Sequence, residues 1–267
     1  MNRILKTLGI CLLMAVTAAQ ADAKSNKIAI AAHRGFWKCE AAGQAQNSIA
    51  SLKAAQENGF WGSEFDVHFT SDNKIVVNHD PAVNGVSIHD NTYATLKEQK
   101  LKNGENISTL DEYLAQGLKA KKTVMVLEVK DQGSDERSVE LADSAIARLK
   151  AYGLFKPSRV IFISFNYAAC KHLASLAPKF MVQYLEADKT PAECHADNIK
   201  GIDYTYKAFY QHPEWVAEAH KLGMEVNAWT VNKKADIQKM IDLGVDCITT
   251  NEPLLVREML GKRENRK

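Results

Sequence analysis

Several features that would narrow the function of this 267-residue sequence are scarce or missing. Charge of one sign is not in excess, with 34 Lys and Arg against 32 Asp and Glu, which argues against nucleic-acid binding through bulk positive charge. The five cysteines form no C-x-x-C pair, so neither a zinc ribbon nor a dithiol redox motif is predicted. With 46% hydrophobic and 25% charged residues, the composition is that of an ordinary folded protein, for which we expect no nucleic-acid partner.

The longest apolar run lies near the N-terminus and is typical of a secretory signal peptide. Residues 1–21 carry Arg3 and Lys6 but no acid, and an apolar stretch extends from about Leu8 to Ala19. This stretch is shorter than the ~20 residues that cross a bilayer. Small-x-small triplets predict cleavage after residue 21 or 23. We therefore expect an exported protein, periplasmic or secreted, without stable membrane insertion after cleavage; an uncleaved anchor is the alternative.

Four cysteines remain after cleavage at either position: Cys39, Cys170, Cys194 and Cys247. In an oxidising compartment they could pair in three ways. They could equally be free thiols buried in a large core. The sequence leaves both possibilities open.

Through the rest of the chain, short apolar runs alternate with stretches of helical periodicity. Nine runs predict strands: Lys27–Ala32, Ser63–Phe69, Ile75–Asn78, Thr123–Val129, Arg159–Phe165, Phe180–Leu185, Ile202–Tyr206, Met224–Val231 and Cys247–Thr250. Six stretches predict helices: Asn47–Glu57, Ser108–Lys119, Glu136–Ala151, Tyr167–Ala177, Pro213–Leu222 and Lys233–Leu243. This alternation is typical of parallel strands joined by helical crossovers.

One connection, over residues 70–74, is too short for a crossover and predicts a hairpin. The eight other strands are the number that a (β/α)₈ TIM barrel requires. An open doubly wound sheet is the alternative, but its dinucleotide site needs a Gly-rich turn after the first strand, where Gly35 stands alone. The expected fold is therefore an α/β TIM barrel over residues 22–267.

Acids, histidines and cations gather at the predicted strand ends, where barrels of this kind carry their functional groups. The candidates are His33, Arg34, Glu64, Asp66, His79, Glu128 and Lys130. Glu64 and Asp66, two residues apart, project from the same face of their strand. A four-residue turn over 71–74 would pair Asp66 with His79 in the hairpin and place both on that face. The six other histidines are expected to be structural or exposed, His68 with the least support.

Three carboxylates in one barrel mouth would repel one another unless a cation neutralises them. Carboxylate oxygens favour a hard ion, so Glu64, Asp66 and Glu128 predict a site for Mg²⁺ or Ca²⁺. The alternative is that Glu64 or Glu128 simply pairs with Arg34 or Lys130.

A divalent ion flanked by two histidines and two cationic side chains favours phosphate chemistry. Arg34 can grip phosphoryl oxygens with two hydrogen bonds. Of His33 and His79, one imidazole can remove a proton while the other supplies one, because their ordinary pKa lies near neutrality.

These motifs resemble those of the glycerophosphodiester phosphodiesterase family. The specific matches are His33-Arg34-Gly35 and EFDVHFTSDNKIVVNHD over Glu64–Asp80. Weaker matches follow in the expected order, among them ISTLDEYL at Ile107–Leu114, LEVK at Leu127–Lys130 and VDCITTNEP at Val245–Pro253. The likeness spans nearly all of the chain after the N-terminal segment.

The resemblance implies a TIM barrel with an insertion over about 81–119, after the second histidine. It implies hydrolysis of a small glycerophosphodiester to glycerol 3-phosphate and an alcohol, through a cyclic phosphate. The implied roles are metal binding by Glu64, Asp66 and Glu128, acid/base catalysis by His33 and His79, phosphate binding by Arg34 and Lys130, and contact of Trp229 with the glycerol.

Two positions depart from the family pattern. Ala45-Gln46-Asn47-Ser48 stands where Pro-Glu-Asn-Thr is frequent, and Asn251 stands where Asp is usual. Two other functions stay open as alternatives: a related phosphodiesterase that acts on phospholipid or phosphoinositide, and a non-catalytic exported barrel that binds phosphodiesters. No basic amphipathic helix, which would favour a membrane substrate, is evident in the sequence.

Overall fold

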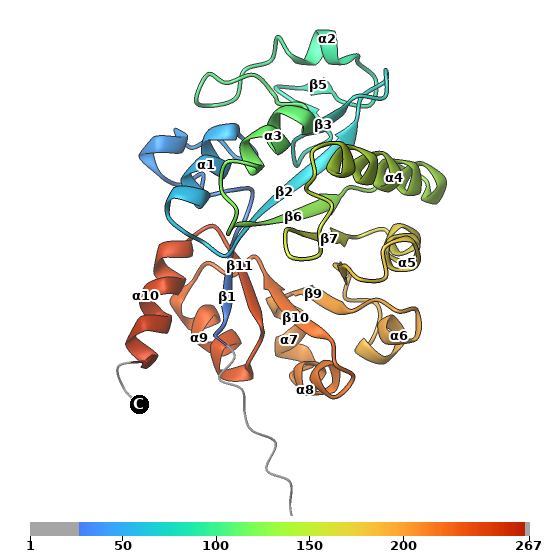
Figure 1. Ribbon diagram of the computed structural model, residues 1–267. Helices are drawn as coiled ribbons and strands as arrows, with labels where there is room; N and C mark the ends of the chain where they lie inside the picture. Colours follow the sequence, from blue (N-terminus) through green and yellow to red (C-terminus); the bar gives the residue numbers. More distant parts are fainter. Residues whose placement is uncertain (1–26, 265–267) are drawn as a thin grey trace, which may run out of the picture.

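The computed structural model describes residues 27–264, and Figure 1 shows them as a ring of strands surrounded by helices. The parallel barrel strands are β1 (Ala29–Ala32), β2 (Gly62–Phe69), β6 (Val124–Val129), β7 (Val160–Ser164), β8 (Met181–Tyr184), β9 (Gly201–Thr205), β10 (Glu225–Trp229) and β11 (Cys247–Thr250). The barrel closes because β1 pairs in parallel with both β2 and β11. The predicted (β/α)₈ fold is confirmed, and the open sheet is excluded.

The hairpin after β2 is present, but its predicted register is wrong by one residue. β3 (Ile75–Val77) runs antiparallel to β2, and Phe69, not Thr70, pairs with Ile75. The loop therefore holds five residues instead of four. Thr70 closes it by donating its N–H to the Lys74 carbonyl at 2.9 Å. Asn73 makes the tight turn in a left-handed conformation, φ 59°, which asparagine tolerates better than most residues.

This register separates Asp66 from His79 in the ladder. The residue opposite Asp66 is Asn78, whose N–H donates to the Asp66 carbonyl at 3.1 Å. β3 has already ended at Val77, so the chain leaves the ladder before His79. The His79 side chain still lines the barrel mouth, because the chain turns there rather than continuing as a strand.

Helices between the strands form the outer layer (Figure 1). Those expected from periodicity are α1 (Ile49–Glu57), α3 (Leu110–Gly117), α4 (Asp135–Ala151), α5 (Tyr167–Leu176), α8 (Glu214–Lys221) and α9 (Lys234–Leu243). Further helices are η1 (Glu40–Ala42), α2 (Tyr93–Leu96), α6 (Pro191–Ala196), α7 (Tyr206–Gln211) and α10 (Pro253–Glu264). Capping boxes begin α1 at Ser48, α3 at Thr109 and α6 at Thr190, where side chains satisfy N–H groups that lack a partner inside the helix.

Residues 81–119, the expected insertion, contain two kinds of structure. The short hairpin of β4 (Ala82–Val83) and β5 (Val86–Ser87), together with α2, packs around a small hydrophobic cluster of its own. In contrast, α3 buries Leu110, Tyr113 and Leu114 in the main hydrophobic core of the protein.

The two faces of β2 carry different kinds of side chain. All eight residues are buried, as in a strand covered on both sides. Phe65, Val67 and Phe69 belong to the hydrophobic core between barrel and helices. The alternating residues Glu64 and Asp66 therefore point into the barrel, because successive side chains leave opposite faces of a strand.

Three further expectations concern the signal peptide, membrane insertion and the cysteines. The expected signal peptide, residues 1–21, and residues 265–267 lie outside the described part. Within residues 27–264 no helix is long and apolar enough to cross a membrane, and Cys39, Cys170, Cys194 and Cys247 are free thiols.

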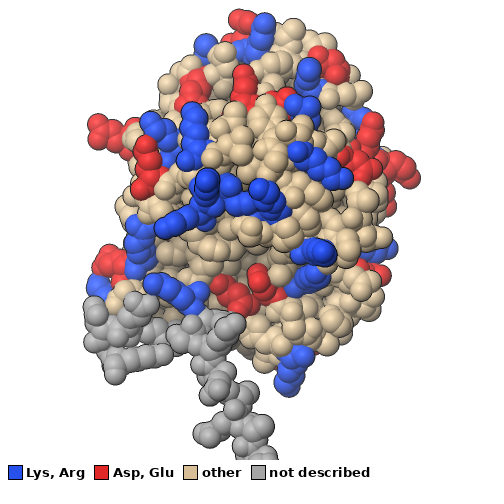
Figure 2. Space-filling model, in the orientation of Figure 1, with Lys and Arg blue, Asp and Glu red and all other residues tan. Residues whose placement is uncertain are grey.

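Figure 2 shows basic side chains near the middle of one face and acids elsewhere on it, so no single charge covers that face.

Candidate active site

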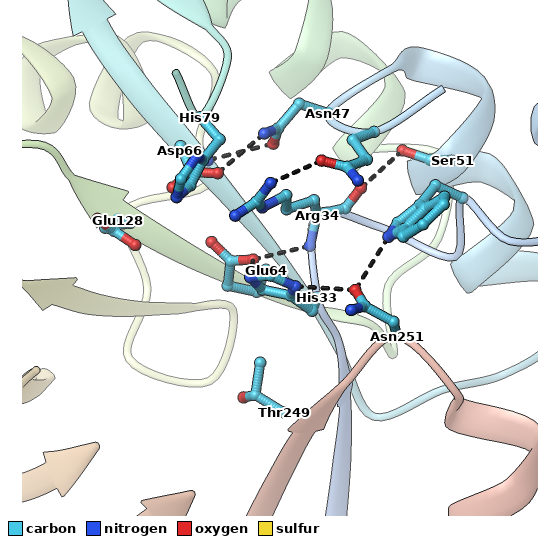
Figure 3. A network of polar contacts seen from close by, with 12 residues as sticks. His33, Arg34, Asn47, Ser51, Glu64, Asp66, His79, Glu128, Thr249 and Asn251 are labelled. Carbon is cyan, nitrogen blue, oxygen red and sulfur yellow. Dashed lines mark hydrogen bonds and ion pairs between the residues drawn. The ribbon is translucent and has the colours of Figure 1, made fainter. Parts of the chain in front are cut away.

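Three carboxylates from β2 and β6 meet at the mouth of the barrel. The two strands pair in parallel with Asp66 beside Glu128, and Glu64 lies two residues before Asp66 on the same face. One oxygen from each acid lies within 4.8 Å of the others. The structure thus brings together the three acids that the sequence suggested as metal ligands, as Figure 3 also shows.

Burial and mutual repulsion perturb these carboxyl groups. Burial, and then the charges of Asp66 and Glu128, raise the pKa of Glu64 well above its ordinary value. Burial and the charge of Asp66 raise the pKa of Glu128 to about 8, although Lys130 opposes the change. Burial alone would raise the pKa of Asp66 too, but Lys130 and His79 outweigh it, so the pKa of Asp66 is lowered.

The donor set fits a hard divalent cation. Glu64 Oε1 is buried and has no hydrogen-bond partner among residues 27–264, which is costly for a polar atom unless a ligand satisfies it. Lys130 Nζ lies 2.8 Å from Glu128 Oε1 and 3.5 Å from Asp66 Oδ1. Lys130 therefore neutralises part of the cluster beside Glu128 and Asp66, while Glu64 Oε1 stays without a hydrogen-bond partner in the described chain.

The chain after β1 wraps around Glu64. Arg34 has a left-handed backbone, φ 57°, which turns its N–H toward Glu64 Oε2 at 2.7 Å. Gly35 follows at φ 78°, and a Cβ there would lie 2.3 Å from the Ser51 hydroxyl oxygen, so only glycine fits. A strained non-glycine residue beside a carboxylate cluster is typical of a functional site.

Arg34 keeps its charge available for an anion. Its Nη1 donates to the amide oxygen of Gln46 at 2.6 Å, while its buried Nε has no hydrogen-bond partner in the described chain. Gln46 orients the guanidinium without neutralising it, whereas a glutamate at that position would add a negative charge. The departure at Gln46 therefore favours binding of an anionic group by Arg34.

Both proposed acid/base histidines reach the cluster (Figure 3). His33 Nε2 lies 4.0 Å from Glu64 Oε2, and only 17% of the His33 side chain is exposed. Burial and the charge of Arg34 lower the pKa of His33 to about 4, so this imidazole is neutral at pH 7. His79 is more open, with Nδ1 2.7 Å from Asp80 Oδ1.

His68, one of the histidines expected to be structural, contacts the main chain of His79. It is buried, and its Nε2 lies 3.1 Å from the His79 carbonyl oxygen. Because a carbonyl only accepts hydrogen bonds, Nε2 carries the proton. Burial lowers the pKa of His68 to about 4, so it holds the His79 backbone as a neutral side chain.

A cavity of about 80 Å³ opens beside the carboxylates. Its polar lining includes His33, Arg34, His79 and the acids Glu64, Glu128 and Asp203, and its apolar lining includes Phe165, Leu185 and Trp229. The Trp229 indole meets Phe165 edge to face at 5.5 Å and donates its N–H to the Asp203 carbonyl at 2.8 Å. Trp229 is thus fixed as a wall of the cavity. A larger hollow, lined by Ile28, Phe60 and Trp61, carries no histidine or acid among its described lining residues.

Three residues that sequence reasoning did not assign also shape the site. Asn47 donates from Nδ2 to Asp66 Oδ2 at 2.8 Å and accepts from the Asp66 N–H at 3.2 Å. Asn251 contacts His33 and Trp37. Asn47 and Asn251 lie in motifs noted as departures, which was a usable signal. Trp37 lies in a loop with no periodicity, so nothing in the sequence indicated it.

Removing the Asn47 side chain should weaken metal binding. Asn47 holds one Asp66 oxygen and leaves Oδ1 facing the cluster, and loss of such supporting contacts costs about 10–100-fold in metal affinity. Glycine suits the backbone of residue 47, φ 54°. We expect Asn47→Gly to need 10–100-fold more Mg²⁺ or Ca²⁺ for half-maximal activity, measured by metal titration after EDTA treatment.

Asn84→Gly is the matched control, because Asn84 has a similar backbone, φ 51°, in the turn between β4 and β5. Its metal requirement should equal that of the wild type. An unchanged requirement in Asn47→Gly would contradict the role of Asn47.

The fold and the site together define a class of enzyme. A TIM barrel with buried acids, two histidines and an arginine at one cavity is an enzyme built to act on an anionic phosphate ester. The model of the glycerophosphoryl diester phosphodiesterase family matches residues 33–255. The chain therefore belongs to the glycerophosphoryl diester phosphodiesterase family of phosphoric diester hydrolases.

Individual relatives agree with the family match. A glycerophosphodiester phosphodiesterase of Caldanaerobacter subterraneus subsp. tengcongensis is 29% identical over 88% of this chain and 99% of its own length. A glycerophosphodiester phosphodiesterase of Bacillus subtilis is 29% identical over 97% and 98%. The crystal structure of a glycerophosphodiester phosphodiesterase from Parabacteroides distasonis is 41% identical, with a TM-score of 0.86 and coverage of 90% of this chain and 99% of that one.

Proposed function

We propose that this enzyme hydrolyses water-soluble glycerophosphodiesters to glycerol 3-phosphate and an alcohol, using one divalent cation, Mg²⁺ or Ca²⁺. The observation that carries the proposal is a cluster of three buried carboxylates beside one small cavity that both imidazoles and Arg34 line. Glu64, Asp66 and Glu128 would hold the cation. When bound, it would polarise the phosphoryl oxygens and favour negative charge at the transition state.

The side chains of the cavity account for binding and proton transfer. Arg34 and Lys130 attract the phosphate, and the indole of Trp229 packs against the glycerol carbon atoms. The glycerol hydroxyl next to the phosphate attacks phosphorus and loses its proton to one histidine, while the other protonates the departing alcohol. The cyclic phosphate that results is opened by water with these roles reversed, which restores both histidines.

A release assay tests this proposal. Glycerophosphocholine, glycerophosphoethanolamine and glycerophosphoinositol should each be assayed for glycerol 3-phosphate after EDTA treatment and after addition of Mg²⁺ or Ca²⁺ separately. We expect release with metal, at least 100-fold less with EDTA, and transient cyclic phosphate by ³¹P NMR. Absence of glycerol 3-phosphate with every substrate and metal would overturn the proposal.

The same assay separates the two alternatives. Turnover of phospholipid or phosphoinositide vesicles at a rate above that of soluble diesters would assign a membrane substrate. Binding of soluble diesters without turnover would assign a binding protein. The retention of both histidines in one cavity, beside the cluster of all three acids, favours catalysis.

We further propose that the enzyme is exported and acts in the periplasm or outside the cell. The basis is the cationic, then apolar, then small-residue order of residues 1–21. The described chain begins at residue 27 and enters β1 two residues later, so cleavage after residue 21 or 23 would leave the barrel intact. Mass spectrometry of the mature N-terminus tests the cleavage.

A further inference from the structure

The side chain of Asn251 connects Trp37 to His33. Asn251 Oδ1 lies 3.1 Å from Trp37 Nε1 and 2.9 Å from His33 Nδ1. Trp37 comes from the loop after β1, and Asn251 follows β11 directly. In Figure 3 the Asn251 side chain lies beside the His33 ring. The three residues therefore form a chain of hydrogen bonds that ends on a proposed catalytic imidazole.

The donor and acceptor roles of Trp37, Asn251 and His33 determine which atom carries the proton in each of these hydrogen bonds. An indole N–H can only donate, so the Asn251 atom that it meets must be the carbonyl oxygen. This contact fixes the orientation of the amide. Because the same oxygen can only accept, His33 Nδ1 must carry a proton. In the neutral imidazole the lone pair is then on Nε2.

The geometry directs that lone pair into the site. His33 Nε2 is the ring nitrogen on the side of the carboxylates, 4.0 Å from Glu64 Oε2. A flipped Asn251 amide would present its NH₂ group to Nδ1 instead. His33 would then adopt the Nε2–H form and could not accept a proton from a substrate.

Hydrogen bonds hold the main chain on both sides of the contact between His33 and Asn251. Asn251 N donates to Asn232 Oδ1 at 2.9 Å, and the Thr250 hydroxyl donates to the same oxygen at 3.2 Å. His33 N donates to the Thr250 carbonyl at 3.0 Å. The main chains of His33 and Asn251 are thus fixed across the pair of strands β1 and β11, and the indole selects the amide orientation.

We propose that Trp37 is a positioning residue that, through Asn251, holds His33 as the Nδ1–H tautomer with a basic Nε2 facing the substrate cavity. The assignment of His33 as the first base rests on the proposed function; the tautomer does not. In that step the glycerol hydroxyl oxygen bonds to phosphorus and its proton passes to His33 Nε2. The alcohol leaves with the electron pair of the broken P–O bond and a proton from His79.

The tautomer can be measured without activity, in long-range ¹H–¹⁵N correlation spectra of the metal-free protein at pH 7.5. His33 is assigned as the signals that disappear in His33→Gln. We expect a protonated Nδ1 and an unprotonated Nε2 in the wild type. Trp37→Phe, which removes the N–H but keeps an aromatic ring, should shift both signals toward a mixture of tautomers. The double variant Trp37→Phe/Asn251→Asp should restore the wild-type pattern, because both oxygens of a carboxylate accept hydrogen bonds.

Activity provides the second readout. With glycerophosphocholine we expect Trp37→Phe to lower kcat about 5–10-fold with KM changed less than twofold, and Trp37→Phe/Asn251→Asp to recover kcat to within about twofold of Asn251→Asp alone. Trp61→Phe, at an exposed tryptophan outside the catalytic cavity, is the matched control and should keep both constants.

An Nε2–H tautomer in the wild type would overturn the proposal, as would a Trp37→Phe variant with unchanged ¹⁵N shifts. An enzyme inactive on all glycerophosphodiesters would instead refute the proposed function, and the spectra would still decide the tautomer.

Discussion

Replacing His33 by glutamine should lower kcat for glycerophosphocholine by about 10²–10⁴-fold, the contribution that a well-placed acid/base group makes. Glutamine occupies similar space and can hydrogen-bond to Asn251, but it cannot accept a proton at neutral pH. Burial and Arg34 lower the pKa of His33 to about 4, so the wild-type imidazole is available as a base throughout the neutral range. KM should change little, because Arg34 and Lys130 would still bind the phosphate.

Two companion variants make this result specific. His79→Gln should cause a loss of similar size. The double variant His33→Gln/His79→Gln should lose much less than the product of the single effects, because groups that act in one step are not additive. His172→Gln is the matched control: His172 pairs with Asp143 on the outer helices, Nε2 to Oδ1 2.6 Å, and its loss should leave kcat unchanged. Retention of more than about a tenth of wild-type kcat in His33→Gln would contradict the role of His33.

The barrel was predictable because its signals are local. Alternation of apolar runs with helical stretches, and one connection too short for a helix, sufficed for the eight parallel strands and the hairpin. The short helix α6 was missed although Thr190, Pro191 and Glu193 form a recognisable helix start, because six residues hold too few turns for a periodicity to be detected.

The carboxylates were predictable for a different reason. Two acids at alternate positions of one strand and a third at the end of the next barrel strand must meet once the strands are parallel neighbours, and Asp66 does pair with Glu128. The position of His79 was inferred from a hairpin register that proved wrong. Its side chain reaches the cavity through a turn after β3 and not from a paired position in the β2–β3 ladder.

The supporting residues could not be derived in this way. Trp37 and Asn251 are 214 positions apart in sequence and meet only because β1 and β11 close the barrel. The contact between Asn47 and Asp66 depends on a left-handed backbone at Asn47, which side-chain patterns do not reveal. Interactions across loops therefore needed the three-dimensional structure, whereas the clustering of the three proposed metal ligands did not.

The same carboxylates should make the metal-free protein less stable as the pH rises. Burial and the charge of Asp66 raise the pKa of Glu128 from 4.5 to about 8 in the folded chain. The folded state thus binds this proton more tightly than the unfolded state, so stability is highest below pH 4.5 for this group and falls as the pH rises toward 8. In EDTA we expect the melting temperature to decrease between pH 5 and pH 8 because of this group, and Mg²⁺ or Ca²⁺ to raise it most at pH 8.

Glu128→Gln should remove this loss of stability at high pH, and it should also abolish catalysis. A tenfold change in proton affinity corresponds to about 1.4 kcal/mol, so removal of the charge should stabilise the metal-free protein at pH 8 by about 2–4 kcal/mol. In a chain of this size that is roughly 5–15 °C in melting temperature. Lys130 keeps Asp66 as its partner, Nζ to Oδ1 3.5 Å, and is not left unpaired. Differential scanning calorimetry at pH 5 and pH 8, with EDTA and with metal, measures the effect.

The exposed residue Glu98 supplies the control, and Glu98→Gln should melt like the wild type under all four conditions. In Glu128→Gln the melting temperature should respond to metal much less than in the wild type. A Glu128→Gln protein less stable than the wild type at pH 8 in EDTA would mean that Lys130 already compensates the cluster. If Lys130 compensates the three acids, no cation is needed to neutralise them. The same experiment therefore decides whether the acids at the barrel mouth bind a metal ion or form an internal ion pair.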